Sequence, residues 1–328
     1  MNVAINGFGR IGRSVLKICL DRNVNVVAIN DLTSPKNLAY LLKYDSVYGV
    51  YNKEVSYGED WLKIGSKKIK VFKEPEPGKL PWRKLKIDVV IESTGRFTDR
   101  KEALRHINAG AKKVIISAPA KNPDITVCPG VNLDKLKRKD RVISVASCTT
   151  NALSPVVKIL NDVFGIEKGF MTTVHAYTPT QAILDGPSNK MRKGRAGAIN
   201  IIPTTSGATD AVTEVIPEMR NKIDGVAMRV PIMCGSIVDF VAVLKKNTNA
   251  KIVNETFKRY SKKEMKGILE YTEEELVSSD VIGNSHSSIV DGLSTQMLGN
   301  NMVKVLAWYD NEFGYSNRMV DVIKKLRG

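Results

Sequence analysis

The feature that most constrains the fold of this chain is a set of three glycines close to its start. Residues 1–6 (MNVAIN) are mostly apolar, as in a buried strand, and Gly7, Gly9 and Gly12 follow with Gly-x-Gly-x-x-Gly spacing. Apolar residues then recur at helical intervals, and a second apolar run covers residues 24–29. Glycines with this spacing between a strand and a helix are typical of dinucleotide-binding domains. We therefore predict a Rossmann-type, doubly wound α/β domain at the start of the chain.

Each glycine has a physical reason to occupy its position. Gly7 allows a tight turn, Gly9 a close approach of the backbone to a pyrophosphate, and Gly12 close packing of the helix on the strand. The pyrophosphate is expected at the helix N-terminus, where free N–H groups and the helix dipole favour anions. Arg10 and Ile11 occupy that N-terminus, and we include them among the cofactor-binding residues.

Asp31 follows the second apolar run, 19 positions after the last glycine. At this spacing its carboxylate is expected to accept hydrogen bonds from the adenosine ribose hydroxyls. A 2′-phosphate at about 4 Å would be repelled by ~4 kcal/mol per unit charge at an effective dielectric constant of ~20. We therefore expect NAD to be preferred over NADP. The alternative is that Asp31 is an ordinary turn residue after a strand.

The rest of the first half alternates strand and helix patterns, which implies a parallel sheet. The predicted elements are a strand at 87–92, a helix at 99–108, and strands at 113–117 and 141–146. Residues 53–73 alternate apolar and polar side chains around Gly65, and we expect a small, peripheral antiparallel excursion there.

After residue 150 the pattern changes to a long helix and long alternating segments, which predict an α+β domain with a mostly antiparallel or mixed sheet. Its expected strands cover 169–177, 225–230 and 236–244, and a long irregular loop covers 179–205. Such a loop is usually functional. We predict an NAD-binding domain at 1–147, a catalytic domain at 148–311, and a final helix at 312–328 that packs back on the first domain.

Size and composition fit a soluble two-domain protein. The chain has 328 residues, of which 43% are hydrophobic and 26% charged. No apolar run approaches the ~18 residues of a membrane span, and the first strand leaves no room for a signal peptide. The four cysteines are far apart, without metal-ligand or redox spacing. We expect a cytoplasmic protein with reduced thiols and no metal site.

The formal net charge of +16 has two explanations: a surface that binds nucleic acid, or a basic protein whose ligands are small anions. The basic clusters, such as residues 135–139, are short and dispersed, and only 6% of residues are aromatic. This pattern favours small anions. Binding to nucleic acid is expected at most as an incidental property at low salt.

Cys148 is the candidate nucleophile. It follows an apolar strand pattern at 142–146 and precedes a helical one, so we place it on a strand-to-helix turn. A thiol with a pKa of ~8.5 is only about 3% ionised at neutral pH. A helix N-terminus contributes ~0.3–1 kcal/mol, whereas a two-unit fall in pKa needs about 2.7 kcal/mol. We therefore expect His175 to supply most of the activation. The alternative is that Cys148 is a small buried apolar residue.

The sequence resembles phosphorylating glyceraldehyde-3-phosphate dehydrogenase over essentially its whole length. The segments that carry the resemblance are residues 6–13 (NGFGRIGR), 92–95 (ESTG), 117–119 (SAP), 147–151 (SCTTN), 175–178 (HAYT), 229–231 (RVP) and 308–312 (WYDNE). The resemblance implies a homotetramer that oxidises D-glyceraldehyde 3-phosphate to 1,3-bisphosphoglycerate with NAD and inorganic phosphate. It also implies a hemithioacetal and then a thioester on Cys148, with His175 as the base.

The resemblance also implies roles for further residues. Thr178 and Arg229 match the residues that bind the substrate phosphate. Those that match the inorganic phosphate site are Ser147, Thr149, Ser206 and Gly207. Residues that match the cofactor site are Thr94 and Ser117, which line the groove, and Asn311, which orients the nicotinamide amide.

Three positions depart from the family pattern and put the phosphate affinities in doubt. Lys193 stands where the family commonly has arginine, Ser206 where threonine is usual, and Thr180 where aspartate is common. Lysine binds phosphate as a point charge, without the fork geometry of arginine. Two other functions remain alternatives at this stage: erythrose-4-phosphate dehydrogenase, which releases its product to water, and a nucleic-acid-binding protein on the same fold.

Overall fold

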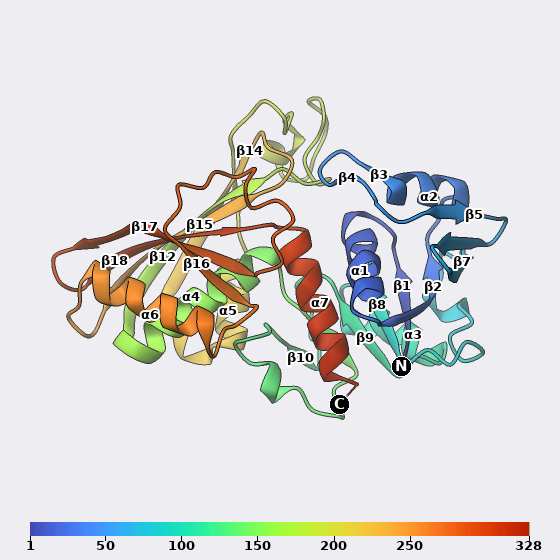
Figure 1. The fold of residues 1–328 in the computed structure, drawn as a ribbon, viewed down its shortest axis with the longest axis horizontal. Coiled ribbons are helices and arrows are strands. Elements are labelled where there is room, and N and C mark those ends of the chain that lie inside the picture. Colours follow the sequence, from blue (N-terminus) through green and yellow to red (C-terminus); the bar gives the residue numbers. More distant parts are fainter. Residues whose placement is uncertain (328) are drawn as a thin grey trace. The chain divides into compact units, whose positions relative to one another are not determined.

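The computed structural model describes residues 1–327, which form two compact units (Figure 1). Unit 1 comprises Met1–Val127, Asp134–Ala146 and the described part of Ser316–Gly328. Unit 2 comprises Cys128–Leu133 and Ser147–Tyr315. The short segment Cys128–Leu133 thus lies outside the unit to which the sequence analysis assigned it. The predicted fold class, a doubly wound domain and an α+β domain, is confirmed.

Unit 1 is built on one nine-stranded sheet with the order β10-β11-β9-β8-β1-β2-β7-β6-β5 among the described residues. Neighbouring strands from β10 to β7 are parallel, whereas β6 pairs antiparallel with β7 and β5. The strands are β1 (Asn2–Asn6), β2 (Asn25–Asn30), β5 (Val55–Tyr57), β6 (Trp61–Ile64), β7 (Lys67–Phe72), β8 (Val89–Glu92), β9 (Lys113–Ile116), β10 (Ile125–Thr126) and β11 (Val142–Ser144). A separate two-stranded pair joins β3 (Tyr44–Asp45) and β4 (Gly49–Val50).

The helices of unit 1 are α1 (Arg10–Asp21), α2 (Pro35–Lys43), α3 (Arg100–Asn108), and the short 3-10 turns Pro77–Lys79 and Leu133–Lys135. Two of the α-helices begin at side-chain caps, whereas Gly9 at the start of α1 provides none. Ser34 accepts a hydrogen bond from Asn37 N at the start of α2, and Asp99 accepts one from Lys101 N at the start of α3. The predicted helix at 99–108 is therefore confirmed with Asp99 as its cap.

The prediction that residues 53–73 form a peripheral excursion is wrong for β7. This strand pairs in parallel with β2, from Ala28 opposite Lys70 to Asn30 opposite Phe72, so it is an integral part of the main sheet. Ile69 and Val71 are buried. Alternation of apolar and polar residues indicates a strand with one exposed face, but it does not reveal which strand will be the neighbour.

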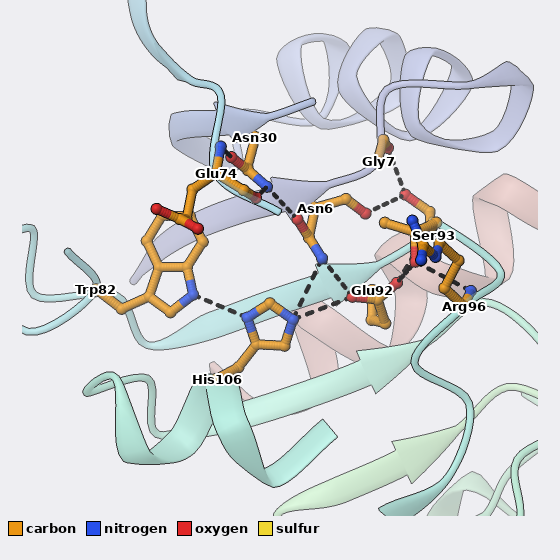
Figure 2. A network of polar contacts seen from close by, with 10 residues as sticks. Asn6, Gly7, Asn30, Glu74, Trp82, Glu92, Ser93, Arg96 and His106 are labelled. Carbon is orange, nitrogen blue, oxygen red and sulfur yellow. Dashed lines mark hydrogen bonds and ion pairs between the residues drawn. The ribbon is translucent and has the colours of Figure 1, made fainter. Parts of the chain in front are cut away.

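A buried polar link crosses the core of unit 1 (Figure 2). The Trp82 indole N–H donates to His106 Nδ1 at 2.9 Å, and His106 Nε2 lies 3.0 Å from Glu92 Oε2. Because an indole can only donate, Nδ1 accepts, and the ring hydrogen lies on Nε2, facing the carboxylate. Trp82 and His106 are both completely buried among apolar side chains. The link therefore joins the segment before β8, helix α3 and the end of β8.

Unit 2 is built on a seven-stranded mixed sheet with the order β13-β14-β12-β15-β18-β17-β16 in the described chain. The pairs β12–β14 and β16–β17 are parallel, and the other pairs are antiparallel. Its strands are β12 (Ile166–Ala176), β13 (Ile202–Thr205), β14 (Ile223–Val230), β15 (Ser236–Leu244), β16 (Leu269–Thr272), β17 (Ser288–Leu298) and β18 (Met302–Tyr309). The predicted strand at 236–244 coincides with β15.

The helices around this sheet are α4 (Cys148–Phe164), α5 (Ala208–Val215) and α6 (Ala250–Lys262), with 3-10 turns at Met191–Gly194 and Pro217–Met219. Helix α7 (Phe313–Lys325) starts in unit 2, and most of it belongs to unit 1. Helix α4 is buried on nearly all sides, which explains its largely apolar sequence. In residues 1–327 no helix is long and apolar enough to cross a membrane.

The Trp82–His106 hydrogen bond gives a test of the unit 1 core. Trp82→Phe keeps an aromatic ring but removes the N–H, which leaves His106 Nδ1 buried without its donor. We expect the free energy of unfolding to fall by about 1–3 kcal/mol, measured by chemical denaturation. The matched control is Trp61→Phe, since Trp61 is only partly buried and contacts Lys68 through its ring face. Equal losses in the two variants would contradict this account.

Candidate active site

Unit 1 contains a cleft of about 280 Å³ at the carboxyl ends of its central parallel strands, the usual ligand position in such sheets. Four of the residues predicted to bind a cofactor line it: Gly7, Gly9, Asp31 and Thr94. Sequence analysis missed the other lining residues, which are Asn6, Asn30, Leu32, Glu74, Pro75, Ser93, Arg96 and Phe97. The cleft is therefore formed by the glycine loop, the end of β2 and the loops after β7 and β8.

A side chain would clash with the backbone at two of the three glycines and would enter open space at the third. Gly7 has a φ of +89°, and a Cβ there would lie 2.6 Å from Thr94 N. A Cβ on Gly12 would lie 2.2 Å from Gly7 O. At Gly9, by contrast, a Cβ would meet no heavy atom of the described chain within 4 Å, other than its chain neighbours and the adjacent helix backbone. Gly7 and Gly12 thus allow the loop to close on itself, and the exposed backbone of Gly9 faces open space.

Asp31 contacts the glycine loop directly. Its Oδ2 accepts a hydrogen bond from Phe8 N at 2.7 Å, and its Oδ1 accepts one from Thr33 N at 3.2 Å. Sequence analysis expected contacts with ribose hydroxyls only. The carboxylate therefore also fixes the loop between Gly7 and Gly9, and it retains acceptor capacity toward the cleft.

Three polar residues lie in register at the ends of adjacent strands (Figure 2), and two of them, Asn6 and Asn30, line the cleft. Asn6 is opposite both Asn30 of β2 and Glu92 of β8. Asn6 Nδ2 donates to Glu92 Oε2 at 2.5 Å, and Asn30 Nδ2 donates to Asn6 Oδ1 at 2.7 Å. Glu92 Oε1 accepts from both Thr94 N and Thr94 Oγ1, and Ser93 Oγ donates to Gly7 O. The strand ends thus hold the loops at Gly7 and Thr94 in fixed positions. The sequence signal that could have revealed them is a polar residue ending each apolar run.

The remaining unit 1 candidates do not line the cleft. The Arg10 guanidinium forms an ion pair with Asp45 at 2.8 Å and lies over the Tyr48 ring. Ile11 belongs to the first turn of α1, and Ser117 follows β9, with its N–H donating to Glu92 O. Arg10 and Ile11 belong to the first turn of α1 and carry their backbone N–H groups there.

In unit 2 the candidate nucleophile and base are adjacent. Cys148 is the first residue of α4, as predicted, and Ser147 caps the helix by accepting a hydrogen bond from Thr150 N at 3.0 Å. Ala146, just before the cap, has a φ of +52°, which is unfavourable for a residue with a Cβ and marks a constrained turn. Cys148 Sγ lies 3.3 Å from His175 Nε2 near the end of β12. The contact joins residues 27 positions apart.

Arg229 is the third member of this cluster. It lies opposite His175 in the parallel pair β12–β14, and its Nη1 is 2.6 Å from His175 Nδ1 and 3.0 Å from Ala176 O. Its Nε is buried and has no hydrogen-bond partner in residues 1–327. The structure therefore brings together the predicted nucleophile, the predicted base and one predicted phosphate ligand.

Burial disfavours the charged forms of both reacting groups. Burial, and secondarily the Arg229 charge, lower the pKa of His175 to about 3. Burial raises the pKa of the Cys148 thiol, and the charge of Arg229 acts in the opposite direction. These directions differ from the activation of Cys148 by His175 that the sequence analysis expected. The reason is that neither residue spacing nor motif reveals desolvation.

Tyr309 connects the helix and the strand that carry the reacting groups. Its hydroxyl lies 2.9 Å from both Thr149 Oγ1 and Thr173 Oγ1, and its ring packs edge-on against His175 at 5.9 Å between centroids. Burial raises the pKa of Tyr309, which keeps the hydroxyl protonated. Thr149 is 5% exposed, and its hydroxyl contacts Tyr309. The hydroxyl predicted to bind phosphate is thus used within the protein in this structure.

Asn311 is linked to the same strand through Ser236. Ser236 Oγ donates to Asn311 Oδ1 at 3.0 Å and accepts from Ala176 N at 3.1 Å. Sequence analysis gave no role to Ser236. It positions both the Asn311 amide and the backbone beside His175.

The other phosphate candidates lie in two places. Thr178 follows β12 and contacts Gln181, whose Nε2 is buried without a partner in the described residues, and Thr180. Ser206 lines a second, open cavity of about 750 Å³ together with Lys193, and Gly207 precedes α5. Cys148 does not line that cavity. Among residues 1–327 no cluster of His, Cys, Asp or Glu could hold a metal ion.

Comparison with known proteins places this chain among close relatives. Residues 1–100 match the family model for the glyceraldehyde 3-phosphate dehydrogenase NAD binding domain, and residues 147–311 match that for the C-terminal domain. A glyceraldehyde-3-phosphate dehydrogenase of Borreliella burgdorferi is 54% identical over 333 residues, 99% of each chain. One from Geobacillus stearothermophilus is 53% identical over 98% of this chain and 97% of its own, and one from Thermotoga maritima is 53% identical over 99% and 98%. The chain therefore belongs to the glyceraldehyde-3-phosphate dehydrogenase family.

Proposed function

We propose that this protein catalyses the NAD-dependent oxidation and phosphorylation of D-glyceraldehyde 3-phosphate to 1,3-bisphosphoglycerate. The observation that supports this best is the cluster of Cys148, His175 and Arg229 in a chain that matches both domains of the family. A thiol, a base and a guanidinium are the groups needed to add to a carbonyl, move its proton and bind a phosphate.

In the proposed reaction, Cys148 Sγ bonds to the aldehyde carbon and gives a hemithioacetal. His175 accepts the hydroxyl proton as the carbon loses a hydride, and a thioester on Cys148 results. The cofactor's contribution is the hydride acceptor. Inorganic phosphate then adds to the thioester carbon, the carbon–sulfur bond breaks, and acyl phosphate leaves. His175 stabilises the charge that develops on oxygen in both halves of the reaction.

NAD fits the residues of the unit 1 cleft. The exposed backbone at Gly9 and the N–H groups of Arg10 and Ile11 suit a pyrophosphate, and the remaining acceptor capacity of Asp31 suits ribose hydroxyls. We assign Gly7 and Gly12 to loop geometry and Thr94 to the cleft wall. Ser117 and Asn311 keep their cofactor roles as proposals based on their match to the family.

For the phosphate groups, we assign Thr178 and Arg229 to the substrate phosphate. Arg229 Nε, buried without a protein partner in residues 1–327, supports this assignment. The residues assigned to inorganic phosphate are Ser147, Thr149, Ser206 and Gly207. Thr149 needs to turn from Tyr309 to take part, so it is the weakest member of this set.

We also propose that the protein is a cytoplasmic homotetramer with an NAD-binding domain (1–147 with 312–328) and a catalytic domain (148–311). Exposed apolar side chains in loop 179–205 support self-association: Ile183, Leu184, Met191, Ile199 and Ile201 are each at least 69% exposed. A surface of this kind is usually covered by another protein surface.

The reaction is tested by its dependence on phosphate. We expect NAD reduction that requires both glyceraldehyde 3-phosphate and inorganic phosphate or arsenate, because the thioester needs an acceptor. The measurement is steady-state absorbance of NADH with and without each anion. Multiple turnovers of erythrose 4-phosphate in the absence of both anions would instead indicate erythrose-4-phosphate dehydrogenase. Nucleic-acid binding without NAD reduction would indicate the remaining alternative.

The role of His175 is tested by His175→Asn. We expect kcat to fall about 10²–10⁴-fold, because proton transfer to and from the substrate oxygen loses its base, while NAD affinity stays near that of the unaltered protein. His286→Asn is the matched control, since His286 contacts Glu270 and Asn284 away from Cys148. Cys148→Ser is expected to have no activity and gives the baseline of the assay. Rapid quench followed by mass spectrometry tests whether an acylated Cys148 forms.

Cofactor choice is tested by Asp31→Ser. Loss of the carboxylate removes the repulsion of a 2′-phosphate, so we expect the ratio of kcat/KM for NAD to that for NADP to fall at least about tenfold. NAD affinity should also weaken, because Phe8 N loses its acceptor. Asp60→Ser, which removes a surface carboxylate paired with Lys70, is the control. An unchanged ratio would show that other groups determine the preference.

A further inference from the structure

Glu92, at the end of β8, carries a carboxylate that is buried in unit 1, with an exposed fraction of only 2%. Its two oxygens serve different parts of the unit (Figure 2). Oε1 accepts hydrogen bonds from the N–H and the hydroxyl of Thr94, which lines the cleft. Oε2 accepts from Asn6 Nδ2 at 2.5 Å and lies 3.0 Å from His106 Nε2. The carboxylate thus joins two residues of the cleft to one residue of the core.

His106 is the one partner of this carboxylate that does not line the cleft. It lies on α3 and is completely buried. Because the Trp82 indole N–H donates to Nδ1 at 2.9 Å, the neutral ring carries its hydrogen on Nε2. The ring therefore donates to Glu92 Oε2. A buried side chain of the core thus supports the carboxylate from the side away from the cleft residues Asn6 and Thr94.

Glu92 also sets the orientation of the Asn6 amide. Since a carboxylate only accepts, Asn6 turns its NH₂ group to Glu92, and its Oδ1 accepts from Asn30 Nδ2 at 2.7 Å. Asn30 Oδ1 in turn accepts from Glu74 N at 2.9 Å. Asn6, Asn30 and Glu74 all line the cleft. A displacement of the Glu92 carboxylate would therefore reach the lining residues on β1, β2 and the loop after β7.

The loop after β8 is packed directly against the glycine loop. A Cβ on Gly7 would lie 2.6 Å from Thr94 N and 2.7 Å from the carbonyl carbon of Ser93, and Ser93 Oγ donates to Gly7 O at 2.7 Å. With so little free space, a movement of Thr94 would displace Gly7 as well. The backbone that follows Gly7 is the part of this fold suited to a pyrophosphate. The position of Thr94 therefore bears on cofactor binding.

A role in stability alone explains the buried carboxylate less well. Burial of a charged group carries a desolvation cost, and apolar residues of similar volume often stabilise a core as well or better. The cluster around Trp82 is apolar and includes Val90, Ile107 and Val114, so close packing is already provided there. A carboxylate with four donors adds fixed directions and distances, which apolar contacts do not provide.

We propose that His106 is a positioning residue for NAD. By donating from Nε2 to Glu92, it holds the carboxylate in the place where Thr94 and Asn6 form the adenosine side of the cleft. Without this donor the carboxylate turns, and the loops at Gly7 and Thr94 lose their fixed positions. The inference concerns NAD binding in the cleft of unit 1 and does not depend on the proposed reaction.

Two substitutions of His106 separate the two hydrogen bonds of its ring. His106→Gln places an amide N–H near the position of Nε2 and keeps a donor for Glu92, whereas the shorter side chain of His106→Asn places its amide near Nδ1 and loses that donor. We expect ADP-ribose, which lacks the nicotinamide, to bind about tenfold more weakly to His106→Asn, because a hydrogen bond to a charged group is lost. His106→Gln should bind it nearly as tightly as the unaltered protein. The measurement is isothermal titration calorimetry, repeated with NAD.

Ile107→Ala is the matched control. Ile107 follows His106 on α3 and belongs to the same apolar cluster as Trp82, so its truncation weakens the core and leaves the donors of Glu92 unchanged. Chemical denaturation should give lower midpoints for both His106→Asn and Ile107→Ala, whereas only His106→Asn should bind ADP-ribose more weakly. The proposal is overturned by equal weakening in these two variants, by unchanged binding in His106→Asn, or by binding in His106→Gln as weak as in His106→Asn.

The unaltered protein provides a second measurement, which applies even if His106→Asn does not fold. If the bond from His106 to Glu92 favours ADP-ribose binding, ADP-ribose must favour that bond to the same extent. We therefore expect exchange of the His106 Nε2 hydrogen with solvent, followed by NMR of ¹⁵N-histidine-labelled protein, to slow about tenfold at saturating ADP-ribose. The chain has three histidines, so the His106 signals are those that remain in both His175→Asn and His286→Asn. Unchanged exchange would refute the proposal. Since neither measurement needs turnover, this inference and the proposed reaction can fail independently.

Discussion

The candidate site depends on the buried imidazole ring of His175. The ring lies between a thiol at Nε2 and a guanidinium at Nδ1, and it is 3% exposed. Water therefore cannot easily satisfy whichever nitrogen its neighbours leave unpaired, and burial disfavours the doubly protonated ring. A base with this degree of isolation responds strongly to the displacement of a single neighbouring charge.

The backbone of unit 2 fixes these contacts with little freedom. His175 and Arg229 are side by side through the register of β12 and β14, and Cys148 is the first residue of a buried helix. The Tyr309 hydroxyl ties the first turn of that helix to β12, and Ser236 holds Ala176 N from the neighbouring strand. Regular secondary structure holds the backbone of each reacting group. The only long flexible side chain in this cluster of Cys148, His175 and Arg229 is that of Arg229. Motion in the site is thus expected to come from the guanidinium.

Much of the fold followed from the sequence because its signals are local. The glycine spacing, the helical pattern in residues 99–108 and the alternation in residues 236–244 each depend on neighbouring residues, and the structure has the corresponding elements. The position of β7 did not follow, because pairing with β2 is a non-local choice. The contact between His175 and Arg229 joins residues 54 positions apart. It requires the register of two strands, and the low pKa of His175 requires its burial, so neither could be predicted from motifs.

Both units place their polar groups by the same physical rule. Asn6, Asn30 and Glu92 each end a buried parallel strand of unit 1, and His175 and Arg229 lie near the ends of a parallel pair in unit 2. A strand end is where polar side chains can leave an apolar sheet and still find partners, so desolvation there is offset by hydrogen bonds. In unit 1 the carboxylate of Glu92 has four protein donors, the Asn6 amide, His106, Thr94 N and the Thr94 hydroxyl, and the result is a fixed loop. In unit 2 the Arg229 Nε has no partner among the described residues, and the result is a buried donor with capacity for a further acceptor.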